Sequence, residues 1–353
     1  MKKLRIAVLV TVLVALIAAL PGPAAVPPAK AQDTIRFWTF DYTDAVAPFF
    51  QAYIDEWNAT HDIQVEWTEF PWAQYTGEIL TTGIATGEAP DVFFISPGDW
   101  RRYAEGGLAL PLNDYVPDYL LEDLLPASVE AVTLNGNIYS IPFEMEPVVL
   151  WYNKAILEEE GVEVPTTWDE LVAAAEALTT EDRYGILLPM NPDYFENFIF
   201  YPFLWMAGAD VVNEDFTAAT VNTPEAARAL DLWGTLVRNG WAAPNSTGND
   251  PTDERFANGQ GAMFVSGYWV WGWLKDNYPE LIEDIGVAPI PAPEAGDELA
   301  TVYGGWTVMV YAGTEHPDEA AEFAINLFGA EDNTRAAEWG MVYNTKLSPR
   351  QSV

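Results

Sequence analysis

The chain of 353 residues contains no cysteine and only two histidines. The missing cysteines exclude disulfides, thiolate nucleophiles, cysteine-ligated metals and attachment of a lipid through a cysteine. The two histidines, His61 and His316, lie far apart in the sequence. Without cysteine they do not complete a common catalytic triad or a zinc site beyond a minimal one. We therefore predict neither a cofactor nor a metal centre.

The chain also lacks the glycine-rich motifs that bind nucleotides and the G-x-S-x-G motif of serine hydrolases. Carboxylate pairs remain as the one enzymatic option. Glu144 and Glu146 in an extended segment would place two carboxylates on one face, as a glycoside hydrolase could use. Among 53 acidic residues, however, such pairs also arise by chance. We predict that the protein is not an enzyme, and an acidic-pair glycoside hydrolase is kept as an alternative.

Positive charge is scarce, with 16 basic residues against 53 acidic ones and a net charge of −37. Such a charge repels nucleic acids and anionic membrane surfaces, so no nucleic-acid partner is expected. Chains this acidic can be disordered, but 50% of the residues are hydrophobic and 14% are aromatic. This composition favours a packed globular protein.

The first 31 residues have the pattern of a signal peptide. Lys2, Lys3 and Arg5 precede an apolar run over residues 6–20, which is shorter than the roughly 20 residues that span a bilayer. Ala29-Lys30-Ala31 then offers an A-x-A cleavage site. We predict a periplasmic or secreted protein, released by cleavage near Ala31. An uncleaved anchor is the alternative.

The rest of the chain is longer than one hydrophobic core usually serves, which predicts two lobes. Its beginning alternates strand and helix patterns: a strand over residues 34–40, a helix with apolar residues on one face, an alternating strand over residues 63–68 and an apolar strand over residues 91–95. Such repetition predicts the α/β class, with a largely parallel sheet and helices on both faces.

Later helices have recognisable starts. Thr167 to Glu170 form a capping-box pattern. Thr223 followed by Pro224 predicts an N-cap and a first helical residue, in a helix that aligns Ala226, Leu230 and Trp233. The segments expected to cross between the lobes are Pro142–Pro147 and Ala288–Pro293.

Residues 267–276, GYWVWGWLKD, hold three tryptophans and a tyrosine. In a strand, Trp269, Trp271 and Trp273 would share one face, whereas in a helix Trp269 and Trp273 would stack and Trp271 would point away. The residues alone leave open whether these rings fill an interior or contact a ligand.

Four stretches carry motifs in a recognisable order, and they are spread over nearly the whole chain. They are residues 89–116 (Pro-Asp before a short strand, then Gly-Leu-x-x-Pro-Leu), 135–171 (Tyr-x-x-Pro, Leu-Trp-Tyr-Asn-Lys and Pro-x-Thr-Trp-Asp-Glu-Leu), 259–274 (Gly-x-x-Ala-Met, then Gly-x-Trp) and 304–328. In this order they resemble the extracellular solute-binding proteins of carbohydrate ABC importers, the maltose-binding-type family 1.

The resemblance implies a two-lobed periplasmic-binding-protein fold of the type II kind. The first lobe would comprise residues 32–144 with 290–353, and the second residues 145–289. It further implies a monomeric receptor that captures a mono- or oligosaccharide in the cleft between the lobes and delivers it to the permease subunits of a membrane ABC importer.

The resemblance also implies a ligand site. Trp269 would lie under a sugar ring, while Trp271 and Trp273 would enter the following helix and pack in the core. Flat sugar faces stack on aromatic rings, and their hydroxyls pair with carboxylates. The ligand-binding residues expected are Phe40, Asp41, Tyr42, Asp99, Trp100, Glu146, Tyr194, Phe195, Trp269, Gly304, Gly305 and Trp306.

Other interpretations remain. Acidic and aromatic side chains could also enclose a cation, so a receptor for a polyamine or a peptide is an alternative within the binding class. A secreted structural or adhesive protein would show repeats, and the chain has none. Finally, members of the family usually continue well beyond the point that matches Gly340. The second lobe is therefore expected to expose more apolar surface than that of a longer relative.

Overall fold

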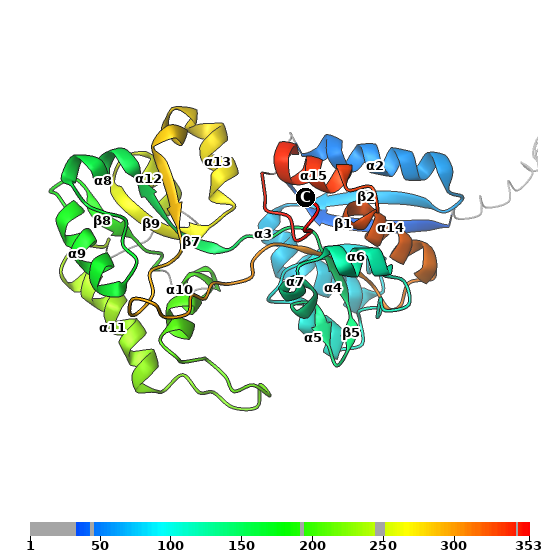
Figure 1. Cartoon of the computed structure of the whole chain (residues 1–353). Coiled ribbons are helices and arrows are strands. Elements are labelled where there is room, and N and C mark those ends of the chain that lie inside the picture. The colour runs from blue at the N-terminus through cyan, green and yellow to red at the C-terminus, as the bar shows by residue number, and fades with distance from the viewer. Residues whose placement is uncertain (1–32, 43–45, 191–193, 244–250, 344) are drawn as a thin grey trace, which may run out of the picture.

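A computed structural model describes residues 33–42, 46–190, 194–243, 251–343 and 345–353. These residues form two α/β lobes, each built around its own β-sheet (Figure 1). The predicted fold class, two α/β lobes joined by crossing segments, is confirmed. The expectation of a largely parallel sheet is wrong, because both sheets mix parallel and antiparallel strand pairs. The predicted signal peptide, residues 1–31, lies outside the described residues.

The sheet of the first lobe has five strands in the order β2-β1-β3-β11-β6. Strand β1 runs parallel to β2 and β3, whereas β11 runs antiparallel to β3 and β6. Because β11 comes from near the end of the chain, two separate parts of the sequence build this lobe. The strands are β1 (Thr34–Phe40), β2 (Gln64–Phe70), β3 (Val92–Ile95), β6 (Ser140–Pro142) and β11 (Thr307–Val310).

The first lobe packs helices against this sheet (Figure 1). Helix α2 (Ala47–Thr60) buries the apolar face that the sequence predicts, including Phe50 and Trp57. The other helices are α3 (Trp72–Gln74), the π-helix η1 (Tyr75–Ile79), α4 (Leu80–Thr86), α5 (Trp100–Glu105), α6 (Asp118–Asp123), α7 (Pro126–Glu130), α14 (Pro317–Gly329), α15 (Thr334–Glu338) and the π-helix η3 (Trp339–Tyr343), beside a small hairpin of β4 (Thr133–Leu134) and β5 (Asn137–Ile138).

The sheet of the second lobe has the order β10-β7-β9-β8, with β7 antiparallel to both neighbours and β8 parallel to β9. Its strands are β7 (Val148–Asn153), β8 (Tyr184–Leu187), β9 (Gly261–Gly267) and β10 (Ile285–Ala288). Its helices are α8 (Lys154–Glu160), α9 (Trp168–Leu178), α10 (Tyr194–Met206), α11 (Pro224–Arg238), α12 (Pro251–Ala257), α13 (Val270–Asn277) and the 3-10 helix η2 (Pro279–Asp284).

The two predicted helix starts in this lobe are confirmed. The Thr167 hydroxyl accepts from the backbone N–H of Glu170 at 3.3 Å, and the Glu170 carboxylate accepts from the backbone N–H of Thr167 at 3.2 Å. At the start of α11 the Thr223 hydroxyl accepts from the backbone N–H of Ala226 at 3.1 Å. The expected buried face of α11 is wrong at Leu230, which is 58% exposed, because the helix buries Ala229 beside Ala226 and Trp233 instead.

The return crossing lies later in the chain than expected. Residue Ala292 still pairs with the second lobe, since its backbone N–H donates to the carbonyl of Thr166 at 3.0 Å, and Ile290 packs in that lobe's core. The chain crosses back only near Gly304, whose carbonyl accepts from the N–H of Glu146 at 3.1 Å. Two extended segments therefore run side by side between the lobes, at residues 143–147 and 303–306.

A third segment joins them from the end of the chain. The carbonyl of Leu347 accepts from the N–H of Met145 at 2.8 Å. Beyond it, the buried guanidinium of Arg350 donates to Asp123 at 2.6 Å and to two backbone carbonyls at the end of α14. The last residues are therefore attached to the crossing segments and to the first lobe.

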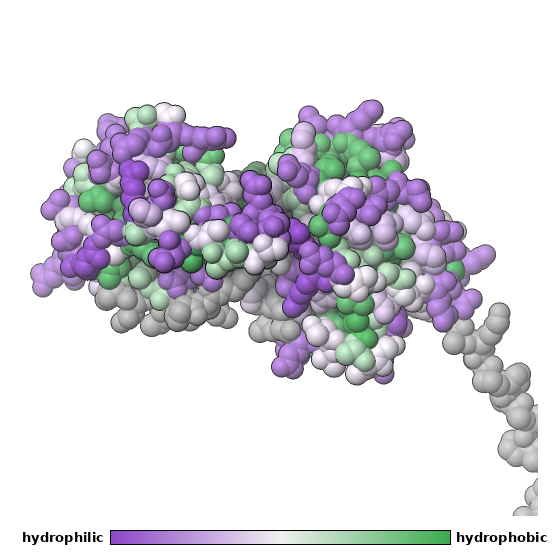
Figure 2. All heavy atoms as spheres, turned by 90° about the horizontal axis from the view of Figure 1, so that it is seen from below, coloured by the Kyte–Doolittle hydropathy of each residue, from purple (hydrophilic) through white to green (hydrophobic). Residues whose placement is uncertain are grey.

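The surface seen in Figure 2 is mainly hydrophilic over both lobes, with scattered apolar areas. The large hydrophobic side chains that the second lobe exposes are Phe216, Val221, Leu230, Trp273, Val287 and Leu299. That the second lobe exposes more apolar surface than the second lobe of a longer relative stays a prediction. Among the described residues, no helix is both long and apolar enough to cross a membrane.

Candidate functional site

A cavity of about 430 Å³ lies between the two lobes, beside the crossing segments. Aromatic side chains form most of its walls, glycines of the return crossing form part of its floor, and three charged side chains reach it. The lining residues are Phe40, Tyr42, Trp72, Ser96, Pro97, Glu144, Glu146, Phe198, Trp269, Gly304, Gly305, Trp306 and Lys346.

The first lobe contributes an aromatic wall. Phe40 ends strand β1 and lies 4.4 Å, between ring centroids, from both Tyr42 and Trp306. Strand β1 is buried within the sheet and ends at Phe40. The residues that follow it therefore lie at the edge of the sheet, beside the cavity. The hydroxyl of Tyr42 is buried and no described residue hydrogen-bonds to it. Burial raises the pKa of Tyr42 well above its usual value, and Glu144 raises it further, so the phenol keeps its proton.

The second lobe contributes Trp269 and Phe198, whose rings are 6.0 Å apart. Trp269 directly precedes helix α13, two residues after Gly267 ends strand β9. A Cβ atom on Gly267 would overlap the indole of Trp269. Glycine at this position therefore lets the ring fold back over the end of the strand and face the cavity.

The floor is formed where the crossing segments touch. Gly305 has φ +105°, in the left-handed region, and a Cβ there would collide with the carbonyl of Glu144. Only glycine fits both restrictions. The close approach holds Glu144 and Glu146 against the return crossing, at 1% and 6% exposure.

Charged side chains meet at this floor. Lys346 forms an ion pair with Glu146, and the Glu144 carboxylate accepts a hydrogen bond from the indole N–H of Trp339 at 3.2 Å. Both glutamates therefore have fixed partners before any ligand binds. Burial lowers the pKa of Lys346 to about 8, although the neighbouring Glu144 carboxylate acts in the opposite direction.

The depressed pKa of Lys346 predicts a stability that depends on pH. Between pH 8 and 10 the folded protein loses this proton, while most of the unfolded chain, with a lysine pKa near 10.5, still holds it. Stability rises with pH wherever the unfolded state binds more protons. We expect the free energy of unfolding of the parent, relative to Lys346→Met, to rise by about 2 kcal/mol over this range. Urea unfolding of both proteins at pH 8 and 10 measures it, and parallel pH profiles would contradict the assignment.

Seven of the twelve residues expected from the sequence line the cavity: Phe40, Tyr42, Glu146, Trp269, Gly304, Gly305 and Trp306. Three others lie elsewhere. The Asp41 carboxylate accepts from the backbone N–H of Trp72 at 2.7 Å. The Asp99 carboxylate accepts a hydrogen bond from the Ser96 hydroxyl and forms an ion pair with Arg102. Trp100 packs in the core of the first lobe. Tyr194 and Phe195 begin α10, but their side chains lie outside the described part of the chain.

Sequence reasoning missed several lining residues. Phe198 lies about one helical turn after the expected aromatic pair, Tyr194 and Phe195. The sequence does not show which side of α10 faces the cavity, so it does not single out Phe198. Glu144 was considered only as a catalytic carboxylate. Lys346 gave no local signal, since its partner Glu146 is 200 residues earlier.

The remaining tryptophans of the segment at 267–276 do not line the cavity. Trp271 lies 6.4 Å from the buried Trp151, ring to ring, and packs against the second lobe's interior. Trp273 is 36% exposed and contacts Tyr278, so the core packing expected of Trp273 is wrong. Of the three indoles, therefore, only that of Trp269 faces the space between the lobes.

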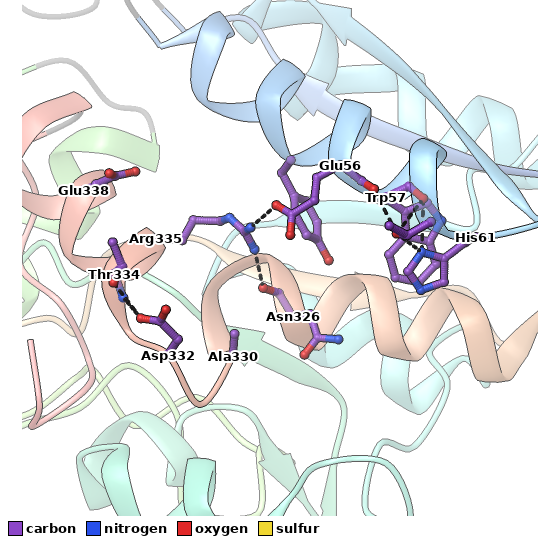
Figure 3. A pocket seen from close by; sticks show the side chains of 11 residues that line it. Glu56, Trp57, His61, Asn326, Ala330, Asp332, Thr334, Arg335 and Glu338 are labelled. Carbon is purple, nitrogen blue, oxygen red and sulfur yellow. Dashed lines mark hydrogen bonds and ion pairs between the residues drawn. The ribbon is translucent and has the colours of Figure 1, made fainter.

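A second hollow of about 440 Å³ lies on the first lobe alone, between α2, the end of α14 and α15 (Figure 3). Two of its charged groups, Arg335 and Glu56, already form an ion pair. Arg335 donates to Glu56 at 2.8 Å and to the carbonyl of Asn326 at 3.1 Å, and the rings of Trp57 and His61 stack at 3.7 Å. Since one lobe forms it entirely, this hollow would not sense a movement of the lobes.

A family model for bacterial extracellular solute-binding proteins matches residues 43–334. Among curated proteins, the chain is 29% identical to the maltotriose-binding protein of Pyrococcus abyssi, over 77% of this chain and 57% of that protein. It is 26% identical to the arabinooligosaccharide-binding protein of Halalkalibacterium halodurans, over 81% and 65%. The chain thus spans less than two thirds of the length of these relatives.

Solved structures show the same fold. The GacH receptor of Streptomyces glaucescens superimposes with a TM-score of 0.76 at 28% identity, covering 91% of this chain and 81% of that one. The cyclic α-maltosyl-1,6-maltose binding protein of Arthrobacter globiformis gives 0.76 at 27% identity, covering 91% and 80%. The predicted resemblance to carbohydrate-binding solute receptors is thereby confirmed.

Proposed function

The chain belongs to the bacterial extracellular solute-binding protein family, and from this we propose that it binds a mono- or oligosaccharide between its lobes and delivers it to an ABC importer. The observation that carries the proposal is the cavity itself. Aromatic rings from both lobes, Trp269 and Phe198 on one side and Phe40 and Trp306 on the other, face a floor with two carboxylates.

This combination suits a sugar better than a purely apolar or a purely ionic ligand. The flat apolar faces of a pyranose ring stack on indole or phenyl rings, while its hydroxyls donate to carboxylates. Tyr42 adds a further aromatic ring to the cavity wall. Two kinds of contact, one for each surface of the sugar, are therefore available within one cavity.

Capture proceeds by closure of the lobes on the ligand. The aromatic residues of the two walls belong to different lobes, so a ligand that touches both is bound more tightly when the lobes approach. A ligand with greater affinity for the closed form shifts the population toward it. The crossing segments near Glu146 and Gly304 are the hinge about which the lobes turn.

We infer that the cavity binds its ligand without transforming it. Glu146 is engaged by Lys346 and Glu144 by Trp339, so neither carboxylate is poised as a free acid or base. The related proteins named above are likewise binding proteins. Incubation with a labelled oligosaccharide checks this: the sugar should be recovered intact, and hydrolysis would favour the glycoside hydrolase alternative.

The remaining parts of the proposal concern location and partners. A signal peptide cleaved near Ala31 would release a monomeric receptor into the periplasm or the medium, and the permease subunits of an ABC importer would receive the ligand. The net charge of −37 favours neither nucleic acids nor anionic membranes as partners.

A thermal-shift screen of the protein from residue 32 onward tests the proposal. Mono- and oligosaccharides are compared with polyamines and short peptides. A ligand at a hundredfold excess over its dissociation constant stabilises the folded state by about 2.7 kcal/mol. A rise in melting temperature with one saccharide class supports the sugar receptor and identifies its substrate. A rise with polyamines or peptides and none with saccharides would contradict it.

A further inference from the structure

A hairpin of residues 211–220 projects from the second lobe toward helix α5 of the first (Figure 1). Its two arms are paired, since the N–H of Asn213 donates to the carbonyl of Ala218 at 3.0 Å and the N–H of Thr220 donates to that of Val211 at 2.9 Å. The hairpin is therefore an ordered projection of one lobe, and it ends beside the other.

The tip of this hairpin presents Phe216. The residue has φ +57°, in the left-handed region that a phenylalanine rarely adopts. Side chains on either side hold it there: the Asn213 carboxamide oxygen accepts from the N–H of Thr217 at 2.9 Å, and the Asp215 carboxylate accepts from the Thr217 hydroxyl at 2.6 Å. The direction of the Phe216 ring is therefore set by the hairpin itself.

The ring stacks on a cation of the first lobe. The guanidinium carbon of Arg101, on α5, lies 4.1 Å from the centroid of the Phe216 ring, within the range of a cation–π interaction. The Nε of Arg101 donates to the Glu105 carboxylate at 2.8 Å, which orients the guanidinium. Phe216 is otherwise 58% exposed, so Arg101 is a principal neighbour of its ring.

We propose that this hairpin is a strap, which limits the opening of the lobes through the contact of Phe216 with Arg101. The crossing segments permit rotation, but they lie together at the hinge. The strap touches α5 away from them, so a wider opening must separate its ring from the guanidinium (Figure 1). The contact therefore stabilises the present separation over more open ones, and the walls of the cavity stay near each other before a ligand arrives.

The interlobe distance in the ligand-free protein tests the strap independently of any sugar. Because the chain has no cysteine, spin labels can be placed at the exposed positions Ala52→Cys on α2 and Ala177→Cys on α9. In Phe216→Asn, which keeps a residue tolerant of positive φ but removes the ring, the ratio of close to open populations should fall about two- to fivefold. Phe216→Tyr, which keeps the aromatic face, should retain the parent distribution.

Two further variants make the assignment specific. Leu230→Ala removes an equally exposed side chain of the same lobe and should leave the distances unchanged. Arg101→Ala should reproduce the effect of Phe216→Asn, and the double variant should show no additional change. If Phe216→Asn gives the parent distribution, or if the two effects add in full, the strap is refuted.

Discussion

Replacing Trp269 with alanine should weaken binding of the saccharide identified by the screen at least about thirtyfold, which corresponds to about 2 kcal/mol. The indole is larger than the ring of Phe198, the other described aromatic side chain that the second lobe places at the cavity, and truncation removes its stacking surface. Isothermal titration calorimetry of the parent and of Trp269→Ala measures the change. Trp269→Phe should retain part of the affinity, since a smaller aromatic face remains.

Trp273→Ala is the matched control. It removes an indole four residues further along, on the helix that Trp269 directly precedes and at a position outside the cavity, and should leave the dissociation constant unchanged. Trp269 also packs against the interior of its lobe, so the melting temperature of each variant is measured alongside. An unchanged affinity in a folded Trp269→Ala protein would remove this residue from the site.

The second large effect concerns stability. Arg350→Ala should lower the free energy of unfolding by about 3–5 kcal/mol, because it breaks a buried ion pair and leaves its partners without their donor. The Arg350 guanidinium donates to Asp123 at 2.6 Å and to the carbonyls of Phe328 and Ala330 at 3.1 and 2.7 Å. Urea unfolding monitored by tryptophan fluorescence measures the loss.

Arg228→Ala provides the comparison for Arg350→Ala. Its ion pair with Glu294 is 2.8 Å long, close to the 2.6 Å of the Arg350–Asp123 pair, but the two side chains are 50% and 68% exposed. Exposed pairs contribute little, so this variant should lose at most about 1 kcal/mol. Equal losses in the two variants would contradict the importance given to burial.

Arg350→Ala should also change the response of the protein to acid. Burial alone would raise the pKa of Asp123, but hydrogen bonds from Ser352 and Arg350 outweigh it and lower the pKa below the usual 3.8. A carboxyl with a lowered folded-state pKa contributes stability above its unfolded pKa, and this stability is lost as the pH falls through the folded value. Without Arg350 the contribution shrinks, so acid unfolding should begin at a higher pH than in the parent.

Local patterns predicted the elements of this fold well. The alternation around Val65, the helical face that includes Phe50 and Trp57, and the cap at Thr167 each depend on residues a few positions apart. The face of α11 was misjudged at Leu230, because an amphipathic pattern with several alanines fits more than one helix rotation. Periodicity indicates that a buried face exists, and packing decides which residues fill it.

The candidate site was less predictable, because its parts come from distant segments. Motif order placed Trp269, Glu146 and Gly305 near a cleft, where the structure also has them. Lys346 could not be found in this way, since a lysine near the end of the chain carries no sign of a partner at position 146. The return crossing was misplaced for a similar reason: the prolines of residues 288–293 indicate an extended segment, but not that it pairs with the residues just before α9 in the second lobe.

The position of β11 has a consequence for the order in which the chain can fold. Strand β11 lies inside the first sheet, between β3 and β6, yet its residues follow the whole second lobe in the sequence. The second lobe is one continuous stretch and its sheet can form as soon as β10 is available. The first sheet must wait for residue 310 before its middle is filled, and contacts between such distant segments form slowly. The lobe at the beginning of the sequence is therefore the last to be completed.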